Sequence, residues 1–326
     1  MSRIWTIGEA LIDFVALEPG ARLGDVSRFQ RAPGGAPANV AAGIACLGGS
    51  AGFIGKVGAD EFGRFLCDTL ATFGVDISRL TMTPEARTAL AFVSLTAEGE
   101  RDFLFYRSPC ADMLLRAEEI ETAGLTGSTL HFGSLSLIQE PSRSAVEAAV
   151  MAVRESGGFV SYDPNLRLAL WPSAAEARRT TRDAVRWAHF VKVSEEEMTF
   201  LTGEQDIEAG ARALLRQGPV LVAVTLGPNG ALVATESVRI HVPGLRVDTV
   251  DTTGAGDGFV AGFLVRLLER MGTWLSPAVL AEVDLRDVGR FANAVGALVT
   301  TRRGAMTALP QRHEVESLLG AESFLR

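Results

Sequence analysis

A glycine-rich segment in the C-terminal third of the chain combines the features of an anion site with one well-placed carboxylate. Residues 250–259 read Val-Asp-Thr-Thr-Gly-Ala-Gly-Asp-Gly-Phe, and their pattern predicts a strand over 246–250, a glycine turn, and a helix over about 255–270. Backbone N–H groups at such a turn, together with the positive end of the helix dipole, attract a negatively charged group. The segment therefore predicts a site for an anion such as phosphate.

Asp257 stands at the beginning of the predicted helix. Its charge would repel a phosphate that was only bound, but it suits a general base that takes a proton from a hydroxyl attacking that phosphate. An ordinary helix N-cap is the alternative. The dinucleotide-binding pattern G-x-G-x-x-G fails at Phe259, and the P-loop pattern fails because Val57 follows Gly55-Lys56. The spacing favours phosphoryl transfer.

Composition excludes several other classes of protein. The chain has 326 residues, and its net charge of −8 argues against nucleic-acid binding. It has no apolar run long enough to cross a membrane, and its first residues do not resemble a signal peptide. The three cysteines form neither a CxxC pair nor an even framework. We therefore expect a soluble protein of a reducing compartment, the cytoplasm, with no membrane partner.

The elements that must position these residues alternate between strands and helices, which predicts an α/β fold with a mostly parallel sheet covered by helices on both faces. Helices are expected over 36–47, over 60–73 with Asp60 as its cap, and over 142–156, 174–187 and 277–300. Strands are expected over 129–132, 158–162, 188–193 and 220–225. Segments 12–30 and 88–107, with a turn at Glu98-Gly99-Glu100, break the alternation. We expect them to form a small separate sheet over the C-terminal ends of the strands, where such folds bind ligands.

A second glycine-rich segment, residues 34–58, makes a resemblance specific. The pattern Gly34-Gly35-x-x-x-Asn39 and the segment Asp251-Thr-Thr-Gly-Ala-Gly-Asp257 resemble the two signatures of the ribokinase/PfkB family of sugar kinases. Smaller motifs fall between them in the expected order, so the resemblance covers nearly the whole chain. These motifs are Asp163-Pro-Asn-Leu-Arg167, Lys192-Val-Ser-Glu-Glu-Glu197 and Thr225-Leu-Gly-Pro-Asn-Gly230.

Within that family the chain most resembles the bacterial fructokinases. The shared motifs are Gly8-Glu9-Ala-Leu-Ile-Asp13, Phe103-x-Phe105-Tyr106-Arg107, Ala111-Asp112 and Leu170-Trp-Pro172. The resemblance implies one ribokinase-like α/β domain over residues 1–326, with the small sheet as a lid. It also implies transfer of the γ-phosphoryl group of ATP to the primary hydroxyl of a small sugar, D-fructose first among them, and a homodimer formed through the lid.

The resemblance also assigns roles to individual residues. Asp257 would be the general base, and the backbone of Gly254, Ala255 and Gly256 would form the anion hole. The sugar would be held by residues from four separate segments, because a polyol needs several hydrogen-bond partners. These are Asp13, Gly34, Gly35, Asn39, Phe105, Arg107 and Arg167.

A further set of residues would hold the nucleotide and the metal ions. Glu197 would organise Mg²⁺ through water, although Ser194-x-x-Glu197 is also a capping box that opens a helix. The family usually has asparagine where Ser194 stands. Asp251 and Thr253 resemble the positions of a monovalent-cation site, such as one for K⁺. The nucleotide would contact Lys192, Ser194, Thr225, Gly227, Gly230 and Asn293, the last of which could equally be a polar residue of the core.

Alternatives remain open at this point. An aminoimidazole riboside kinase, a 2-keto-3-deoxygluconate kinase and a ribokinase would share the fold and the catalytic loop. A sugar-binding sensor without catalysis would share the fold, but the presence of Asp257, the glycine turn and Glu197 argues against it. A dinucleotide-dependent dehydrogenase is disfavoured by Phe259.

Overall fold

The computed structural model describes residues 3–18, 20–95, 101–271 and 282–323, so the predicted turn at 98–100 and the first residues of the helix predicted over 277–300 lie outside it. The strands are β1 (Ile4–Ile7), β2 (Leu11–Ala16), β3 (Phe29–Gly34), β4 (Ala51–Gly58), β5 (Asp76–Thr83), β6 (Leu90–Leu95), β7 (Arg101–Tyr106), β8 (Thr129–Gly133), β9 (Phe159–Asp163), β10 (Phe190–Ser194), β11 (Leu221–Thr225), β12 (Ala231–Ala234) and β13 (Arg239–Val242). The α-helices are α1 (Ala36–Cys46), α2 (Glu61–Thr72), α3 (Ser142–Glu155), α4 (Ala174–Val185), α5 (Glu195–Thr202), α6 (Ile207–Leu215), α7 (Ala255–Met271), α8 (Glu282–Thr300) and α9 (Arg312–Ser323). Among these described helices, none has both the length and the hydrophobicity that crossing a membrane demands.

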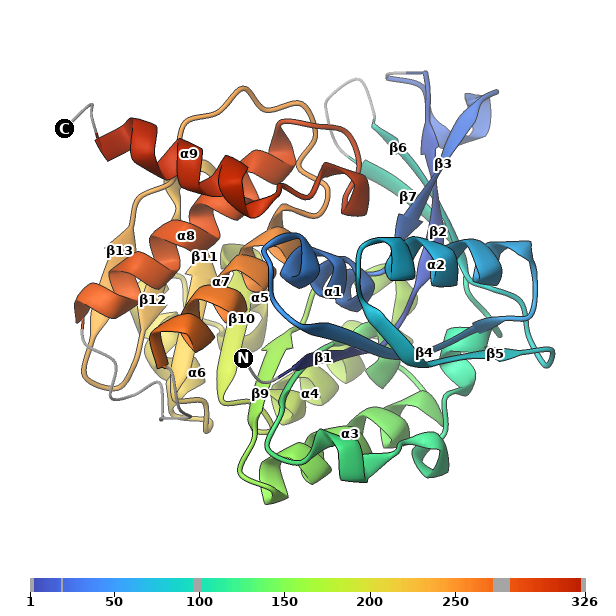
Figure 1. Ribbon diagram of the computed structural model, residues 1–326, viewed down its shortest axis with the longest axis horizontal. Helices are drawn as coiled ribbons and strands as arrows, with labels where there is room; N and C mark the ends of the chain where they lie inside the picture. The colour runs from blue at the N-terminus through green and yellow to red at the C-terminus, as the bar shows by residue number, and fades with distance from the viewer. Residues whose placement is uncertain (1–2, 19, 96–100, 272–281, 324–326) are drawn as a thin grey trace.

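A nine-stranded sheet crosses the molecule in the order β13-β12-β11-β10-β9-β8-β1-β4-β5. Its strands from β11 to β5 are parallel, and β12 pairs antiparallel with both β11 and β13. Successive side chains point to opposite faces. Helices cover both faces of this sheet (Figure 1). Phe190 packs in the core shared with residues of α1, α7 and α8, whereas the next residue, Val191, packs in the core shared with residues of α3, α4 and α6. The predicted α/β fold with helices on both faces is confirmed.

A separate four-stranded sheet has the order β3-β2-β6-β7 and stands beside α1 and α2 at the upper right of Figure 1. Its register aligns Asp13 with Ala91, and Ala91 with Phe105. Because aligned residues share a face of a sheet, Asp13 and Phe105 point to the same side. The small sheet is the one expected from segments 12–30 and 88–107; its role as a lid stays a prediction.

The strand predicted over 246–250 is wrong. Residues 243–249 form no regular element, and the N–H groups of Val250 and Asp251 both donate to the carbonyl of Thr300, at 2.8 and 3.1 Å. The segment therefore ends on the last turn of α8 instead of pairing with a strand. Alternating apolar residues describe an extended backbone, but they do not supply a neighbouring strand to pair with.

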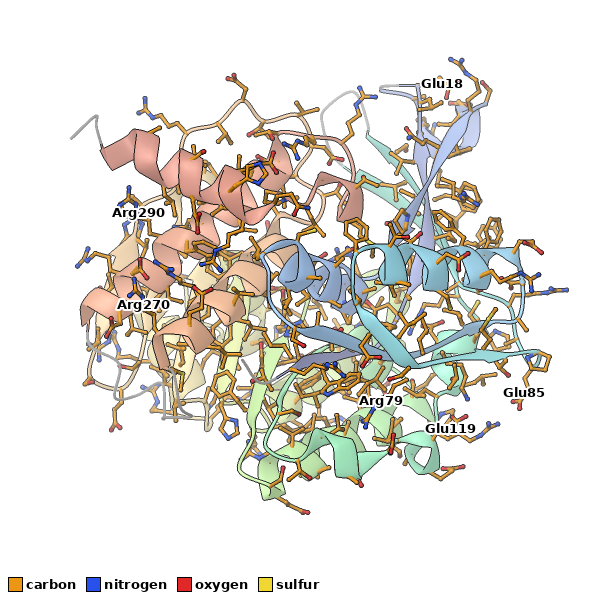
Figure 2. The ribbon with its side chains drawn as sticks, viewed as in Figure 1. Glu18, Arg79, Glu85, Glu119, Arg270 and Arg290 are labelled. Carbon is orange, nitrogen blue, oxygen red and sulfur yellow. The ribbon has the colours of Figure 1, made fainter. Side chains whose placement is uncertain are left out.

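Strand β5, which the sequence did not predict, forms one edge of the large sheet. Arg79 of this strand lies over the ring of Trp5, at 4.6 Å from its centre. Glu85 and Glu119 lie in the same region (Figure 2), where Glu119 pairs with Lys56 at 2.6 Å. Charged side chains along an edge strand oppose pairing with another sheet.

Candidate active site

The predicted anion loop leads into α7, and glycine is required at its tightest point. Gly254 has a φ of 77°, and a Cβ there would lie 2.8 Å from the Cα of Ala305. The carboxylate of Asp251 fixes the loop, because its Oδ1 accepts from the N–H and the hydroxyl of Thr253 at 2.9 and 2.7 Å. Its Oδ2 accepts from the N–H of Gly304 at 3.0 Å. The beginning of α7 is thus held as a positive helix end, which suits an anion.

Two cavities meet at this loop. The smaller has a volume of about 240 Å³, the larger has a volume of about 670 Å³, and Thr252 and Gly256 line both. The predicted residues that line the smaller cavity are Asp13, Gly35, Asn39, Phe105, Arg167, Lys192, Thr253, Gly254, Gly256 and Asp257. Those that line the larger one are Thr225, Gly227, Gly230, Ala255, Gly256 and Asn293. Residues predicted from distant segments therefore do converge, on the two sides of one loop.

Asp257 lies buried between the loop and α1. The side-chain amide of Asn39 donates to its Oδ2 at 2.8 Å. Burial raises the pKa of Asp257 to about 6, against the hydrogen bond from Asn39, which lowers it. The carboxylate is consequently ionised at neutral pH and basic enough to accept a proton.

Asp13 faces Asp257 across the smaller cavity, and the adjacent glycines make room for it. A Cβ on Gly34 would lie 2.2 Å from Oδ2 of Asp13, and one on Gly35, whose φ is 101°, would lie 2.4 Å from the carbonyl oxygen of Glu9. Burial raises the pKa of Asp13 to about 7; Arg167 opposes this shift and Asp257 adds to it. Gly34 thus leaves space for the carboxylate of Asp13, while Gly35 itself lines the cavity.

Phe105 and Arg107 were both predicted to bind the sugar, but the structure places only Phe105 at the smaller cavity. Phe105 lines the smaller cavity, but Arg107 is only 5% exposed and lies outside the residues that line it. The guanidinium of Arg107 donates to Asp112 at 2.7 Å and to the carbonyl of Leu135 at 3.3 Å. Arg107 therefore holds the end of β7 against the body of the protein.

The larger cavity is bordered by the turn after β11 and by α8. Gly230 has a φ of 93°, and a Cβ there would lie 2.1 Å from the carbonyl oxygen of Val242. The amide of Asn293 donates to the carbonyls of Val242 and Pro243, both at 3.0 Å. Asn293 thus ties α8 to the segment that follows β13, and it also lines the cavity.

Glu197 and Ser194 form the capping box of α5. The carboxylate of Glu197 accepts from the N–H of Ser194 at 2.8 Å and from that of Leu166 at 2.7 Å. Neither residue lines either cavity. No group of three or more His, Cys, Asp or Glu side chains that could hold a metal ion occurs within the described residues. From the part of the chain that the structure describes, each carboxylate oxygen of Glu197 accepts one hydrogen bond, so a second lone pair on each could accept from a metal-bound water, which fits an indirect contact with Mg²⁺.

Three charged or amide residues of the smaller cavity, Glu9, Asp163 and Asn165, were not predicted as site residues. Glu9, which follows β1, is only 2% exposed, and its Oε1 accepts from the N–H of Ala36 at 3.2 Å. Asp163 ends β9; it pairs with Lys192 at 2.9 Å and accepts from the N–H of Asn165 at 3.1 Å. All three line the cavity. Polar residues directly after buried parallel strands were the available signal, because such strand ends share one edge of the sheet.

Comparison with known proteins agrees with this geometry. Residues 1–312 match the family described as pfkB family carbohydrate kinase. The chain is 47% identical over 321 residues to probable fructokinase-4 of Arabidopsis thaliana, covering 98% of this chain and 97% of that protein.

Solved structures of sugar and riboside kinases are also similar to this chain. A double mutant of fructokinase from Vibrio cholerae O395, in a form with fructose, ADP and potassium ion bound, superposes with a TM-score of 0.87 at 42% identity over 98% of each chain. Aminoimidazole riboside kinase from Salmonella enterica, complexed with aminoimidazole riboside and an ATP analogue, gives a TM-score of 0.81 at 32% identity, over 97% of this chain and 99% of that one.

Proposed function

The chain belongs to the pfkB family of carbohydrate kinases, and we propose that it transfers the γ-phosphoryl group of ATP to the primary hydroxyl of D-fructose, forming fructose 6-phosphate and ADP. The observation that carries the proposal is the position of Gly256, which lines both the small polar cavity and the larger cavity, with Asp257 beside it. The two cavities would hold sugar and nucleotide on opposite sides of one anion-binding loop. The named fructokinases among its relatives support fructose as the acceptor.

Asp257 would begin the reaction by removing the proton of the hydroxyl. That oxygen then bonds to the γ-phosphorus while the bond from phosphorus to the β–γ bridging oxygen breaks, and its electron pair leaves with ADP. The backbone N–H groups of Gly254, Ala255 and Gly256 would stabilise the charge on the phosphoryl oxygens during transfer. Loss of one such donor typically slows a reaction by about 10²–10³-fold.

The sugar would be oriented by side chains that converge from several elements. Asp13 and Asn39 offer an acceptor and an amide, Arg167 offers a cation, and Phe105 closes the side towards the small sheet. Arg107 would contribute by holding the end of β7 in place, because its guanidinium is already bound to Asp112.

The nucleotide would occupy the larger cavity, along Thr225, Gly227, Gly230 and Asn293. Mg²⁺ would arrive with the phosphates of ATP, neutralise part of their charge, and contact Glu197 through water.

A monovalent cation would stiffen the loop at Asp251 and Thr253. If that is correct, replacing K⁺ by tetramethylammonium lowers kcat at saturating ATP and sugar; an unchanged kcat contradicts a cation requirement.

The substrate is tested by an ADP-release assay over a panel of acceptors. D-fructose, aminoimidazole riboside, 2-keto-3-deoxygluconate and D-ribose are compared at equal enzyme concentration, and we expect kcat/KM for D-fructose to exceed the others by at least about tenfold. The similarity to aminoimidazole riboside kinase makes that riboside the second candidate. Faster turnover of another acceptor would retain the kinase and reject fructose.

We also propose a homodimer formed through the outer face of the small sheet. Leu104 and Tyr106 are 47% and 58% exposed on the face opposite Phe105, next to Phe92. Such a patch of large apolar side chains is typical of a protein interface.

A cytoplasmic location also remains our prediction; it is consistent with Cys46, Cys67 and Cys110 all being free thiols.

A further inference from the structure

Lys192 places a buried positive charge directly behind the anion loop. Lys192 is only 6% exposed, and its ammonium group donates to Oδ2 of Asp163 at 2.9 Å. Both residues line the smaller cavity. An ammonium group has three N–H donors, and this is the one hydrogen bond that the described residues give to it. Donors therefore remain for a ligand.

Gly256 allows the ammonium group to lie against the loop. A Cβ on Gly256 would be 2.9 Å from Nζ of Lys192, and the backbone of Gly256 lines both cavities. Nζ is consequently located where the contents of the two cavities meet. Any residue other than glycine at position 256 would place a Cβ in the space that Nζ of Lys192 now occupies.

The charge of Lys192 is maintained despite its burial. Burial opposes the charged form, but Asp163, Glu197 and Asp257 together raise the pKa of the lysine above its ordinary value. The pair with Asp163 is neutral as a whole, so it adds no net charge to the cavity before substrates bind. It nevertheless presents a positive end to any negative charge that develops beside Gly256.

We propose that Lys192 stabilises the transferring phosphoryl group in the transition state, and that Asp163 is the residue that positions it. This inference rests on the proposed kinase function and deepens it. A lysine used only to bind ATP would affect KM for ATP, whereas a lysine that acts on the moving phosphoryl group affects kcat.

The chain offers a matched control, because its only two lysines are Lys56 and Lys192. Lys56 is also buried and also paired with a carboxylate, that of Glu119 at 2.6 Å, but it lines neither cavity. Both Lys56→Met and Lys192→Met remove the buried cation of an ion pair, although Glu119 is exposed and Asp163 is buried, and each is expected to lower the melting temperature. A purely structural role for Lys192 predicts that the two variants behave alike in catalysis.

The decisive experiment compares kinetics and transition-state analogue binding in the two variants. Lys192→Met should lower kcat by about 10²–10³-fold, and its affinity for ADP with aluminium fluoride and fructose should fall by a similar factor. Its affinities for ADP alone and fructose alone should change by less than about threefold. Lys56→Met should leave kcat within about twofold of the wild type. Unchanged kcat in Lys192→Met, or a change confined to KM for ATP, would overturn the inference.

Gly256→Ala and a labelling experiment give independent readouts. The alanine should move the flexible end of Lys192, so that kcat falls while the fold and ADP binding persist. With ¹³C-labelled lysine, the Lys192 ε-carbon signal should shift when ADP, aluminium fluoride and fructose are added together, and the Lys56 signal should not. A shift of neither signal in an active enzyme contradicts the proposal. A wild type with no kinase activity on any acceptor would instead reject the proposed function.

Discussion

The carboxylate of Asp257 is surrounded by groups that act on its pKa in opposite directions. Burial raises the pKa to about 6, the hydrogen bond from Asn39 lowers it, and Asp163 raises it again. A general base works best when its pKa is close to the operating pH. The neighbours of the proposed base therefore hold its pKa close to the neutral range.

Asp257→Asn should lower kcat by about 10²–10⁴-fold, because an amide cannot accept the proton of the sugar hydroxyl. Binding of ATP and of fructose should remain, since the amide fills the same space. Calorimetric titration and ADP release measure the two effects separately. Asp183→Asn, an exposed position on α4, serves as the control. Equal turnover in the wild type and Asp257→Asn would show that another group is the base.

The pH dependence of kcat/KM should fall on the acid side with an apparent pKa of about 6, because Asp257 must be ionised to act. Asn39→Ala removes a hydrogen bond that favours the ionised form, so the acid limb should move to higher pH. Asp13 titrates at about 7 in the same cavity, so the profile belongs to a coupled pair. A limb that stays in place or moves to lower pH in Asn39→Ala contradicts the assignment.

Glu9 provides a test of stability instead of activity. Burial raises its pKa from 4.5 to about 7, against the attraction of Arg107. The folded state therefore holds this proton at pH values where the unfolded chain has lost it, and stability falls as the pH rises through this range. Glu9→Gln should raise the free energy of unfolding by on the order of 1–3 kcal/mol at about pH 8 and change it little at about pH 5.

Urea unfolding at the two pH values measures this difference, with the exposed Glu195→Gln as the control. A larger gain at the acid pH than at the alkaline pH would show that the charge of Glu9 is stabilised in the folded protein.

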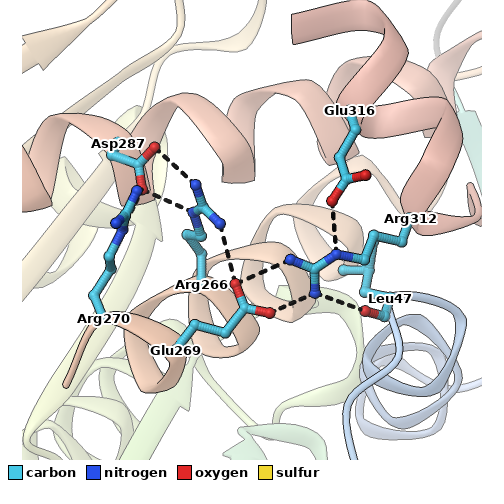
Figure 3. A network of polar contacts seen from close by, with 7 residues as sticks. All are labelled: Leu47, Arg266, Glu269, Arg270, Asp287, Arg312 and Glu316. Atoms are coloured by element: carbon cyan, nitrogen blue, oxygen red, sulfur yellow. Dashed lines mark hydrogen bonds and ion pairs between the residues drawn. The ribbon is translucent and has the colours of Figure 1, made fainter. Parts of the chain in front are cut away.

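At the scale of the elements, α7 connects the anion loop to the rest of its helical layer. Figure 3 shows the network: Arg266 of α7 binds Asp287 of α8 at 2.7 and 3.1 Å. Glu269 of α7 accepts from Arg266 and from Arg312 of α9, each at 3.2 Å. Arg312 also donates to the carbonyl of Leu47 after α1, at 3.4 Å. One carboxylate, that of Glu269, thus joins two arginines from different helices.

Glu269→Gln should lower the free energy of unfolding by about 1 kcal/mol at neutral pH, because Arg266 and Arg312 each lose one of two charged acceptors and keep only Asp287 and Glu316. The pKa of Glu269 is lowered in the folded state, by the hydrogen bond from Arg312 among other causes and against the effect of burial. The stabilisation is therefore present above the ordinary pKa of glutamate and is lost as the pH falls below it. Denaturant unfolding at neutral and acid pH measures this.

Glu316 offers the comparison, since it binds the same Arg312 at 2.8 Å from an exposed position, with a side chain 57% exposed. Exposed pairs contribute between about 0 and 1 kcal/mol, so Glu316→Gln should cost less than Glu269→Gln. Equal losses in the two variants would show that burial of the Glu269 network adds nothing.

At the scale of the whole molecule, the two faces of the small sheet have different surroundings. Asp13 and Phe105 face the cavity, whereas Phe14, Phe92 and Tyr106 form a chain of aromatic contacts on the other face. The homodimer that we propose through that outer face would place the small sheet at the subunit interface.

We expect a solution mass of twice the 34.6 kDa of the chain, measured by light scattering. Tyr106→Arg should shift the mass towards one chain, because a charge on the apolar patch must be desolvated on association. Met82→Arg is the matched control, since Met82 is 39% exposed on β5 of the large sheet, away from the patch. A wild type that remains a single chain at micromolar concentration contradicts the dimer.

Much of the fold and part of the candidate site could be predicted from local patterns. The cap of α2 formed as expected, with Asp60 accepting from the N–H of Gly63. The glycine turn before α7 is also a local feature, because Gly254 requires a positive φ. Periodicity and caps depend on residues a few positions apart, which a sequence shows directly.

Only the tertiary structure decided which side chains reach the cavities. Arg107 and Glu197 occur in motifs that resemble binding residues, yet their polar atoms are bound by Asp112 in one case and by backbone N–H groups in the other. Asp163 and Lys192 are 29 residues apart in the chain, and they meet because β9 and β10 are neighbouring parallel strands. The sequence by itself determined which groups were available and how each turn begins. Packing decided their partners, because contacts between distant segments depend on strand order and on the space that glycines leave open.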